Sequence, residues 1–228
     1  MAVKPSPISA WSYSRYTTYK QCPFKFKCKF VDKIKEPQND AMLRGIKIHQ
    51  EAEDYLNYKI KYVPESLSKL KNDFVELREK GAVAEEQWGI TRDWQETGFF
   101  SRDVWLRLKI DSRNNISTKK INMIDFKTGK IRDGYEEQLE LYSTAAFSIF
   151  DIKEVTTQLW YIDHGVILGK DKEEASTFTF KLKDHKNLLK LWEGRVKSMM
   201  NDTRYTPTPN YTCQWCFFSK SNNGPCKF

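Results

Sequence analysis

Apolar residues recur every three or four positions in several stretches of the chain, which is the spacing of helices that bury one face in a core. Two short helical pieces are expected between Ser9 and Ile34, separated at Pro23. A long amphipathic helix is expected from about Asp40 to Lys59. Its apolar side comprises Met42, Ile46, His49, Ala52 and Leu56. Further helices are expected at about residues 65–80, 135–150 and 185–200.

Short stretches rich in β-favouring residues lie between these helices and predict strands. The predicted strands are residues 82–90, 103–111, 121–129, 155–163 and 176–182. Turn-prone residues, among them the SRNN at 112–115, separate the first three. The order of helices, strands, helix, strands and helix favours an α/β fold with a mixed central β-sheet flanked by helices, over a helical bundle or a β-sandwich.

The composition is that of a chain with a substantial core: 39% of its 228 residues are hydrophobic and 14% aromatic. We expect a single domain over residues 1–228, with its core at about 40–200. A formal charge of +8 suits a polyanionic partner such as nucleic acid, although a solvated basic surface explains it equally well. No stretch reads as a signal peptide or a membrane span. We therefore expect a cytoplasmic, intracellular protein, either of a cell or of a virus acting in its host's cytoplasm.

Acidic and basic residues alternate with apolar ones in the strand predicted at 121–129. Asp125 and Lys127 point to one side of this strand, and Ile124 and Phe126 point to the other. Asp111 lies on the polar side of the preceding strand, so that Asp111 and Asp125 can meet if the strands are neighbours. Short D-x-K triplets also recur on ordinary solvated strands. Here the charges stand at the end of an apolar element, which favours a catalytic role.

Carboxylates in such a pair bind Mg²⁺ or Mn²⁺, and the bound ion can activate water and stabilise charge on a phosphodiester. We expect Asp111 and Asp125 to hold the ion. His49 lies on the apolar side of its helix, where a hydrogen-bonded core histidine is the ordinary explanation. Beside two carboxylates, its imidazole would complete a mixed site that suits Mn²⁺. Lys127 would orient or deprotonate the attacking water, or stabilise the transition state as a cation.

Gln138 and Tyr142 are four residues apart and therefore share a face of the helix that follows the D-x-K strand. They could hold Lys127 or a DNA phosphate. Ordinary surface residues of an amphipathic helix are the alternative.

The chain has five cysteines, and no secretory signal accompanies this odd number, so complete disulfide pairing is not expected. They are Cys22, Cys28, Cys213, Cys216 and Cys226. Thiolates from about 12–35 and 205–228 would bind a metal centre that joins the two ends of the chain. Structural Zn²⁺ suits four thiolates as an iron–sulfur cluster does, and free buried cysteines are the remaining alternative.

Four motifs taken together resemble the PD-(D/E)XK nuclease superfamily, in particular its RecB-type exonuclease branch, over residues 12 to 228. They are RGIKIH with His49, KID with Asp111, DFKTGK with Asp125 and Lys127, and QLELY with Gln138 and Tyr142. The resemblance implies a restriction-endonuclease-like core. It assigns the metal to His49, Asp111 and Asp125, the water to Lys127, and support of the site to Gln138 and Tyr142. That branch also carries an acidic residue on the first strand, and alternation does not choose between Glu85 and Glu86.

The resemblance implies a [4Fe–4S] cluster as well, because iron–sulfur members, including AddB-like and CRISPR-associated nucleases, carry one cysteine before proline and three near the C-terminus. Cys22, Cys213, Cys216 and Cys226 match this layout. The gap before Cys226 is longer than the family usually shows, which leaves Cys28 as a substitute for the last ligand.

The implied activity is that of a metal-dependent DNA exonuclease acting on single-stranded ends, in DNA replication, repair or recombination, with a helicase or recombination protein as partner. A structure-specific endonuclease on the same core is one alternative. A non-catalytic DNA-binding module with a structural metal centre is the other.

Overall fold

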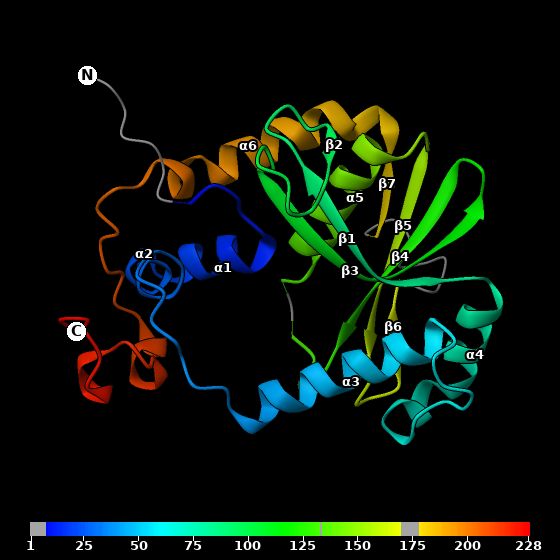
Figure 1. Cartoon of the computed structure of the whole chain (residues 1–228), viewed down its shortest axis with the longest axis horizontal. Coiled ribbons are helices and arrows are strands. Elements are labelled where there is room, and N and C mark those ends of the chain that lie inside the picture. Colours follow the sequence, from blue (N-terminus) through cyan, green and yellow to red (C-terminus); the bar gives the residue numbers. More distant parts are fainter. Residues whose placement is uncertain (1–7, 133, 170–177) are drawn as a thin grey trace. The chain divides into compact units, whose positions relative to one another are not determined.

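The computed structural model describes residues 8–132, 134–169 and 178–228 of the chain (Figure 1). The chain divides into two units. The first unit combines Met1–Pro37 with Lys190–Phe228, and the second is Gln38–Leu189. All five cysteines belong to the first unit, and all the candidate nuclease residues belong to the second. The expectation of a single domain over the whole chain stays a prediction.

The second unit is an α/β layer structure built around one mixed sheet, as the order of elements predicted (Figure 1). Its helices are α3 (Asp40–Leu56), the 3-10 helix η2 (Glu65–Leu70), α4 (Lys71–Glu79), α5 (Glu136–Ile149), the 3-10 helix η3 (Leu182–Asp184) and the first residues of α6 (His185–Asn201). Its strands are β1 (Val83–Ile90), β2 (Glu96–Thr97), β3 (Leu106–Ser117), β4 (Lys120–Lys127), β5 (Glu154–Tyr161), β6 (Val166–Leu168) and β7 (Thr179–Lys181).

The strand order is β2-β1-β3-β4-β5-β6, and β7 also pairs with β5. Strands β1, β3 and β4 pair antiparallel, whereas β4 and β5 pair parallel. A parallel pair needs a crossover connection, and α5 provides it. This mixed sheet with helical flanks is consistent with a restriction-endonuclease-like core.

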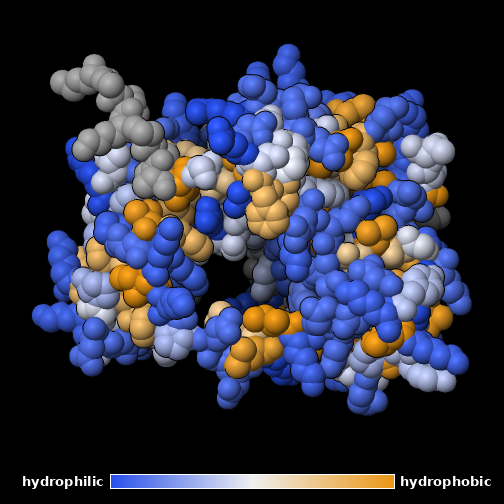
Figure 2. Space-filling view, viewed as in Figure 1, coloured by the Kyte–Doolittle hydropathy of each residue, from blue (hydrophilic) through white to orange (hydrophobic). Residues whose placement is uncertain are grey.

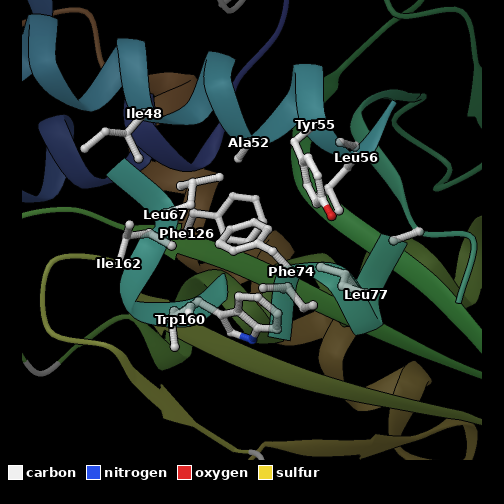
Figure 3. Close-up of a cluster of buried hydrophobic side chains, with 14 residues drawn as sticks. Ile48, Ala52, Tyr55, Leu56, Leu67, Phe74, Leu77, Phe126, Trp160 and Ile162 are labelled. Carbon is white, nitrogen blue, oxygen red and sulfur yellow. The ribbon is translucent and has the colours of Figure 1, made fainter. Parts of the chain in front are cut away.

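Helices cover both faces of the sheet. On one face, α3, η2 and α4 bury apolar side chains against Ile124, Phe126 and Trp160 (Figure 3). On the other face, Leu139 of α5 packs with Leu159 and Tyr161 of β5. Alternation along β4 and β5 separates these two sets of residues. The same alternation turns Asp125 and Lys127 of β4 toward the α5 face.

The first unit contains helical pieces from both ends of the chain. They are α1 (Tyr13–Gln21), α2 (Pro23–Phe26), the π-helix η1 (Lys27–Val31), the remainder of α6, and the 3-10 helices η4 (Tyr211–Trp215) and η5 (Lys220–Asn222). Ser12 caps α1 by accepting a hydrogen bond from the backbone N–H of Arg15 at 3.4 Å. Trp11 stacks on Trp192 of α6, with ring centroids 5.9 Å apart. These contacts hold residues from the two ends of the sequence together.

Several predicted elements differ from the observed ones. The SRNN residues at 112–115 continue β3 instead of forming a turn, because Asn114 pairs with Asn122 of β4 and their side chains are hydrogen-bonded. The helix predicted at 65–80 begins as the 3-10 helix η2 and becomes α-helical at Lys71. The short strands β2 and β6 were not predicted. Residues 176–177 of the strand predicted at 176–182 lie outside the described residues, and β7 begins at Thr179.

The apolar side predicted for the helix at 40–59 is only partly buried. Ile48, Ala52, Tyr55 and Leu56 enter the core, whereas Met42 and Ile46 are exposed. None of the described helices is long and apolar enough to cross a membrane.

Candidate active site

Strand register brings three acidic residues side by side on neighbouring strands. Ala84 pairs with Ser112 and Glu86 with Ile110, so Glu85 of β1 lies opposite Asp111 of β3. The β3–β4 ladder reaches the pair of Ser112 and Ile124, and the next residues in this register are Asp111 and Asp125. The strands of Asp111 and Asp125 are therefore neighbours, which is the condition for the two carboxylates to meet.

The backbone at these acidic residues departs from a regular sheet. Asp111 accepts a hydrogen bond on Oδ2 from the backbone N–H of Phe126 at 2.7 Å. A side chain thus takes the place of a backbone carbonyl where the ladder ends. Glu85 has a φ of 59°, in the left-handed region that residues other than glycine rarely adopt. Outliers of this kind concentrate at functional sites, where the surrounding structure holds them in place.

His49 faces the carboxylates of β1 and β3 from α3. Its Nδ1 lies 3.4 Å from Oδ1 of Asp111 and 3.9 Å from Oε1 of Glu85. Burial disfavours the charged imidazole, but the carboxylates of Asp111 and Glu85 outweigh it and raise the pKa of His49 to about 10. A cation bound by the same carboxylates would compete with this proton.

The ligand atoms of His49, Glu85 and Asp111 lie within 4.8 Å of one another, close enough to share one metal ion. Two carboxylates and one imidazole form a mixed oxygen and nitrogen donor set that suits Mn²⁺ and Mg²⁺. Alternation did not show whether Glu85 or Glu86 belongs to the site; the residue that lies there is Glu85. Glu86 instead accepts two hydrogen bonds from Arg113, from Nε at 2.6 Å and from NH2 at 2.8 Å.

A hydrogen-bonded chain lies beside this cluster and links β4 to α5. Lys127 Nζ is 2.5 Å from Oδ2 of Asp125 and donates a hydrogen bond to Oε1 of Gln138 at 2.9 Å. Gln138 Nε2 donates to Oδ1 of Asp125 at 2.8 Å and to the hydroxyl of Tyr142 at 2.6 Å. Tyr142 in turn donates to the backbone carbonyl of Lys109 at 3.2 Å. The four sequence-predicted residues Asp125, Lys127, Gln138 and Tyr142 thus form one network.

The Asp125 carboxylate is 2% exposed. Burial raises its pKa, Lys127 opposes the shift, and the nearby Asp111 adds to it. The charged form of Asp125 therefore depends on positive charge in the site. Asp125 lies between Asp111 and Lys127 and therefore connects the cluster of Glu85 and Asp111 to the lysine.

Tyr135 is part of the site, although sequence reasoning missed it. Its ring lies under Lys127, with Nζ 4.1 Å from the ring centroid. A cation and the face of an aromatic ring attract each other electrostatically. The signal in the sequence was the position of Tyr135 immediately before α5, on the side of the helix that carries Gln138.

A second network that sequence reasoning missed centres on Asp163, which follows β5. Its carboxylate accepts a hydrogen bond from Arg44 NH1 of α3 at 2.9 Å and one from the backbone N–H of Gly129 at 2.6 Å. His164 Nε2 lies 2.8 Å from the carbonyl oxygen of Gly129. Asp163 therefore ties the helix that carries His49 to the segment that follows Lys127.

Asp163→Asn is expected to destabilise the protein at neutral pH and progressively less at acid pH. The Arg44 guanidinium, with help from the Gly129 N–H, lowers the pKa of Asp163 from 3.8 to about 2. A carboxyl group whose pKa is lower in the folded state stabilises that state above its unfolded pKa, and the effect is lost as the pH falls toward 2. Urea unfolding at pH 7, 5 and 3 measures the difference from wild type. Asp93→Asn is the matched control, because Asp93 is an exposed aspartate outside this network. A difference that stays constant from pH 7 to 3 would contradict this role of Asp163.

The four cysteines predicted as cluster ligands line one cavity of the first unit, together with Phe24, Pro207 and Phe218. Cys22 stands between α1 and α2, Cys213 lies in η4, and Cys216 directly follows η4. Asn210 fastens η4 near Cys22 by donating a hydrogen bond to the carbonyl of Gln21 at 3.4 Å.

Cys28 is separate from the cavity lining and fully buried. Burial, followed by Asp32, raises the pKa of its thiol to about 11.

Comparisons with known proteins support the architecture. The profile of the PD-(D/E)XK nuclease superfamily matches residues 10–221. Among solved structures, the chain is similar to a "Putative exonuclease" from Eubacterium rectale, with 13% identity, a TM-score of 0.50, and coverage of 91% of this chain and 87% of that one. It is also similar to SSO0001, with 15% identity, a TM-score of 0.42, and coverage of 92% and 84%. No curated protein matches the sequence. The likeness to the Eubacterium rectale protein shows a common fold.

Proposed function

Because the chain belongs to the PD-(D/E)XK nuclease superfamily, we propose that it is a deoxyribonuclease that requires Mg²⁺ or Mn²⁺. The observation that carries the proposal is the cluster of His49, Glu85 and Asp111 directly beside the network of Asp125 and Lys127. A divalent ion held there would make water more nucleophilic and offset the negative charge that builds up on the phosphate.

Lys127 acts on the water and on the phosphate as a cation. Asp125 and the ring of Tyr135 lie against its Nζ, and Gln138 fixes its direction. From this position the ammonium group donates a hydrogen bond to the attacking water and stabilises charge on the phosphate oxygens. Of the two roles considered for Lys127, these contacts favour the cationic one.

Asp125, Gln138 and Tyr142 position the catalytic lysine. Gln138 bridges Asp125 and Lys127, and Tyr142 anchors Gln138 to the backbone of β3. A site held by two strands and one helix keeps its geometry when the substrate enters. Asp125 also completes the acidic set, so that an ion bound to Asp111 would lie close to its carboxylate as well.

We assign the reaction to DNA ends, and preferentially to single strands. The name of the Eubacterium rectale protein agrees with exonuclease activity, but catalytic residues do not determine how DNA enters a site. A structure-specific endonuclease on the same core would cut circular DNA, whereas an exonuclease would cut only linear DNA. Roles in replication, repair or recombination, and a helicase partner, stay predictions.

We also propose that Cys22, Cys213, Cys216 and Cys226 bind a [4Fe–4S] cluster. The cavity that these four cysteines share supports this assignment. Cys28 does not line this cavity, which supports leaving it out. The cluster would fasten the C-terminal residues to α1 and α2 without taking part in hydrolysis.

Glu85→Gln is expected to lower the affinity for Mn²⁺ at least about 10-fold and to slow DNA cleavage at limiting Mn²⁺, because one ligand charge is lost. Glu86→Gln is the matched control: it breaks the contact with Arg113 and should leave Mn²⁺ binding unchanged. Mn²⁺ titrations of both variants, with cleavage assays at low and high Mn²⁺, measure the effects. Equal Mn²⁺ affinities in the two variants would exclude Glu85 as a ligand and count against the proposed metal site.

A further inference from the structure

The first two turns of α3 carry three large apolar side chains that are exposed. Met42 is 45%, Leu43 is 48% and Ile46 is 56% exposed. Figure 2 shows hydrophobic atoms gathered over this part of α3. We call these three residues the α3 ridge. Single exposed apolar residues are ordinary, but a group on one short segment indicates a contact surface.

The α3 ridge leads toward the candidate metal site. Met42, Ile46 and His49 follow one another at spacings of four and three residues, and therefore lie on the same side of the helix. At a rise of 1.5 Å per residue, Ile46 and Met42 lie about 4.5 and 10.5 Å from His49 along the helix axis. Both are within reach of nucleotides next to a phosphate bound at His49.

The loop of residues 128–132 lies against the same helix. Gly45 of α3 faces Thr128 so closely that a Cβ at Gly45 would be 3.2 Å from the Thr128 hydroxyl. Gly129, with a φ of 84°, is held by the hydrogen bond from its N–H to Asp163. The start of the loop is therefore fixed against α3, immediately after Lys127.

This loop presents exposed cations. Lys130 and Arg132 are exposed, and Ile131 between them is 48% exposed. No carboxylate among residues 8–132, 134–169 and 178–228 forms an ion pair with Lys130 or Arg132. The site is thus bordered by apolar side chains on α3 and by cations on the loop.

We propose that the α3 ridge and the loop together bind single-stranded DNA next to the scissile phosphate. Met42 and Ile46 contact nucleobases, and Lys130 and Arg132 contact phosphates. The inference rests on the proposed function and names the side chains that would bind the single strand.

The combination of apolar side chains on α3 and cationic side chains on the loop favours single-stranded over duplex DNA. A duplex keeps its base faces stacked inside and offers a protein mainly phosphates and groove edges, for which cations suffice. A single strand exposes apolar base faces together with phosphates, and proteins meet it with apolar and cationic side chains in alternation.

The test is DNA binding measured by fluorescence anisotropy without divalent metal, on a single strand and on a duplex of equal length. Met42→Ser with Ile46→Ser is expected to weaken single-strand binding about 5- to 10-fold and duplex binding less than about 2-fold. Lys130→Ala with Arg132→Ala should weaken binding to both and lower the salt dependence by up to about two charges. Ile116→Ser, at a residue that is 53% exposed at the end of β3, controls for loss of an exposed apolar side chain.

Unchanged single-strand binding in the ridge variant, or equal losses on single strand and duplex, would overturn the proposal. A wild-type dimer that becomes monomeric in the ridge variant would overturn it in favour of a second copy. Since binding is measured without metal, a protein that binds single strands through the ridge but never cuts DNA would overturn only the proposed nuclease.

Discussion

Lys127→Met is expected to slow DNA cleavage by about 10²–10⁴-fold while DNA binding and Mn²⁺ binding persist. Methionine has a similar length but offers neither a proton donor nor a positive charge. In the folded protein, Lys127 joins Asp125, Gln138 and Tyr135, and it is the cation of the network that borders the metal cluster. Its loss leaves the attacking water without a hydrogen-bond donor at that position.

The cleavage rate at saturating DNA and Mn²⁺ measures this effect. Lys183→Met is the matched control, since Lys183 is an exposed lysine of η3 that contributes to neither the site nor the proposed DNA surface. Thermal unfolding of both variants would show whether the fold is intact. If folded Lys127→Met cuts DNA within about threefold of wild type, the roles assigned to this network are wrong.

Cys216→Ser is expected to release the metal centre and to unfold the C-terminal part of the first unit. Thiolate metal centres in small domains contribute binding free energies of about 10–16 kcal/mol to folding, measured for structural zinc. The residues around Cys213 and Cys216 consist of short 3-10 turns, and Tyr211 and Trp215 among them are largely exposed. Phe218 is buried beside them, but short turns with two exposed aromatic residues bury little else, so we expect this segment to depend on the metal centre for its stability.

Cys28→Ala provides the control for this prediction, because Cys28 is fully buried and does not line the cavity. Anaerobically purified protein should contain iron and acid-labile sulfide in wild type and Cys28→Ala but not in Cys216→Ser. Hydrogen exchange of residues 205–228 should accelerate only in Cys216→Ser. If wild-type protein contains zinc instead of iron, the metal centre is a structural zinc ion and the proposed iron–sulfur cluster is wrong. If folded wild-type protein contains no metal, the proposed metal centre is wrong as a whole.

The spacing of residues within individual β-strands and helices predicted much of the candidate site. Alternation in β4 put Asp125 and Lys127 on one face, and helical spacing put Gln138 and Tyr142 on one side of α5. Both patterns depend only on local geometry, which is why they survive in the folded chain. The mixed sheet likewise followed from the order of elements, because a helix between two strands favours a parallel crossover.

Features that depend on distant contacts were not predictable in this way. The left-handed backbone of Glu85 breaks the alternation that would have separated it from Glu86, and only the fold shows which residue meets His49. Asp163 looks like an ordinary residue after a strand until Arg44 and Gly129 are placed beside it. The helical spacing also did not predict that Met42 and Ile46 are exposed, because amphipathic spacing does not show how far along a helix the core extends.

Cleavage of end-labelled linear single-stranded DNA by anaerobically purified wild-type protein tests the central claim most directly. We expect cleavage with Mg²⁺ or Mn²⁺ and none with EDTA, because Asp111, Glu85 and His49 would act through a bound ion. Equal cleavage in EDTA, or no cleavage of single-stranded, duplex or circular DNA by folded protein supplied with metal, would contradict it.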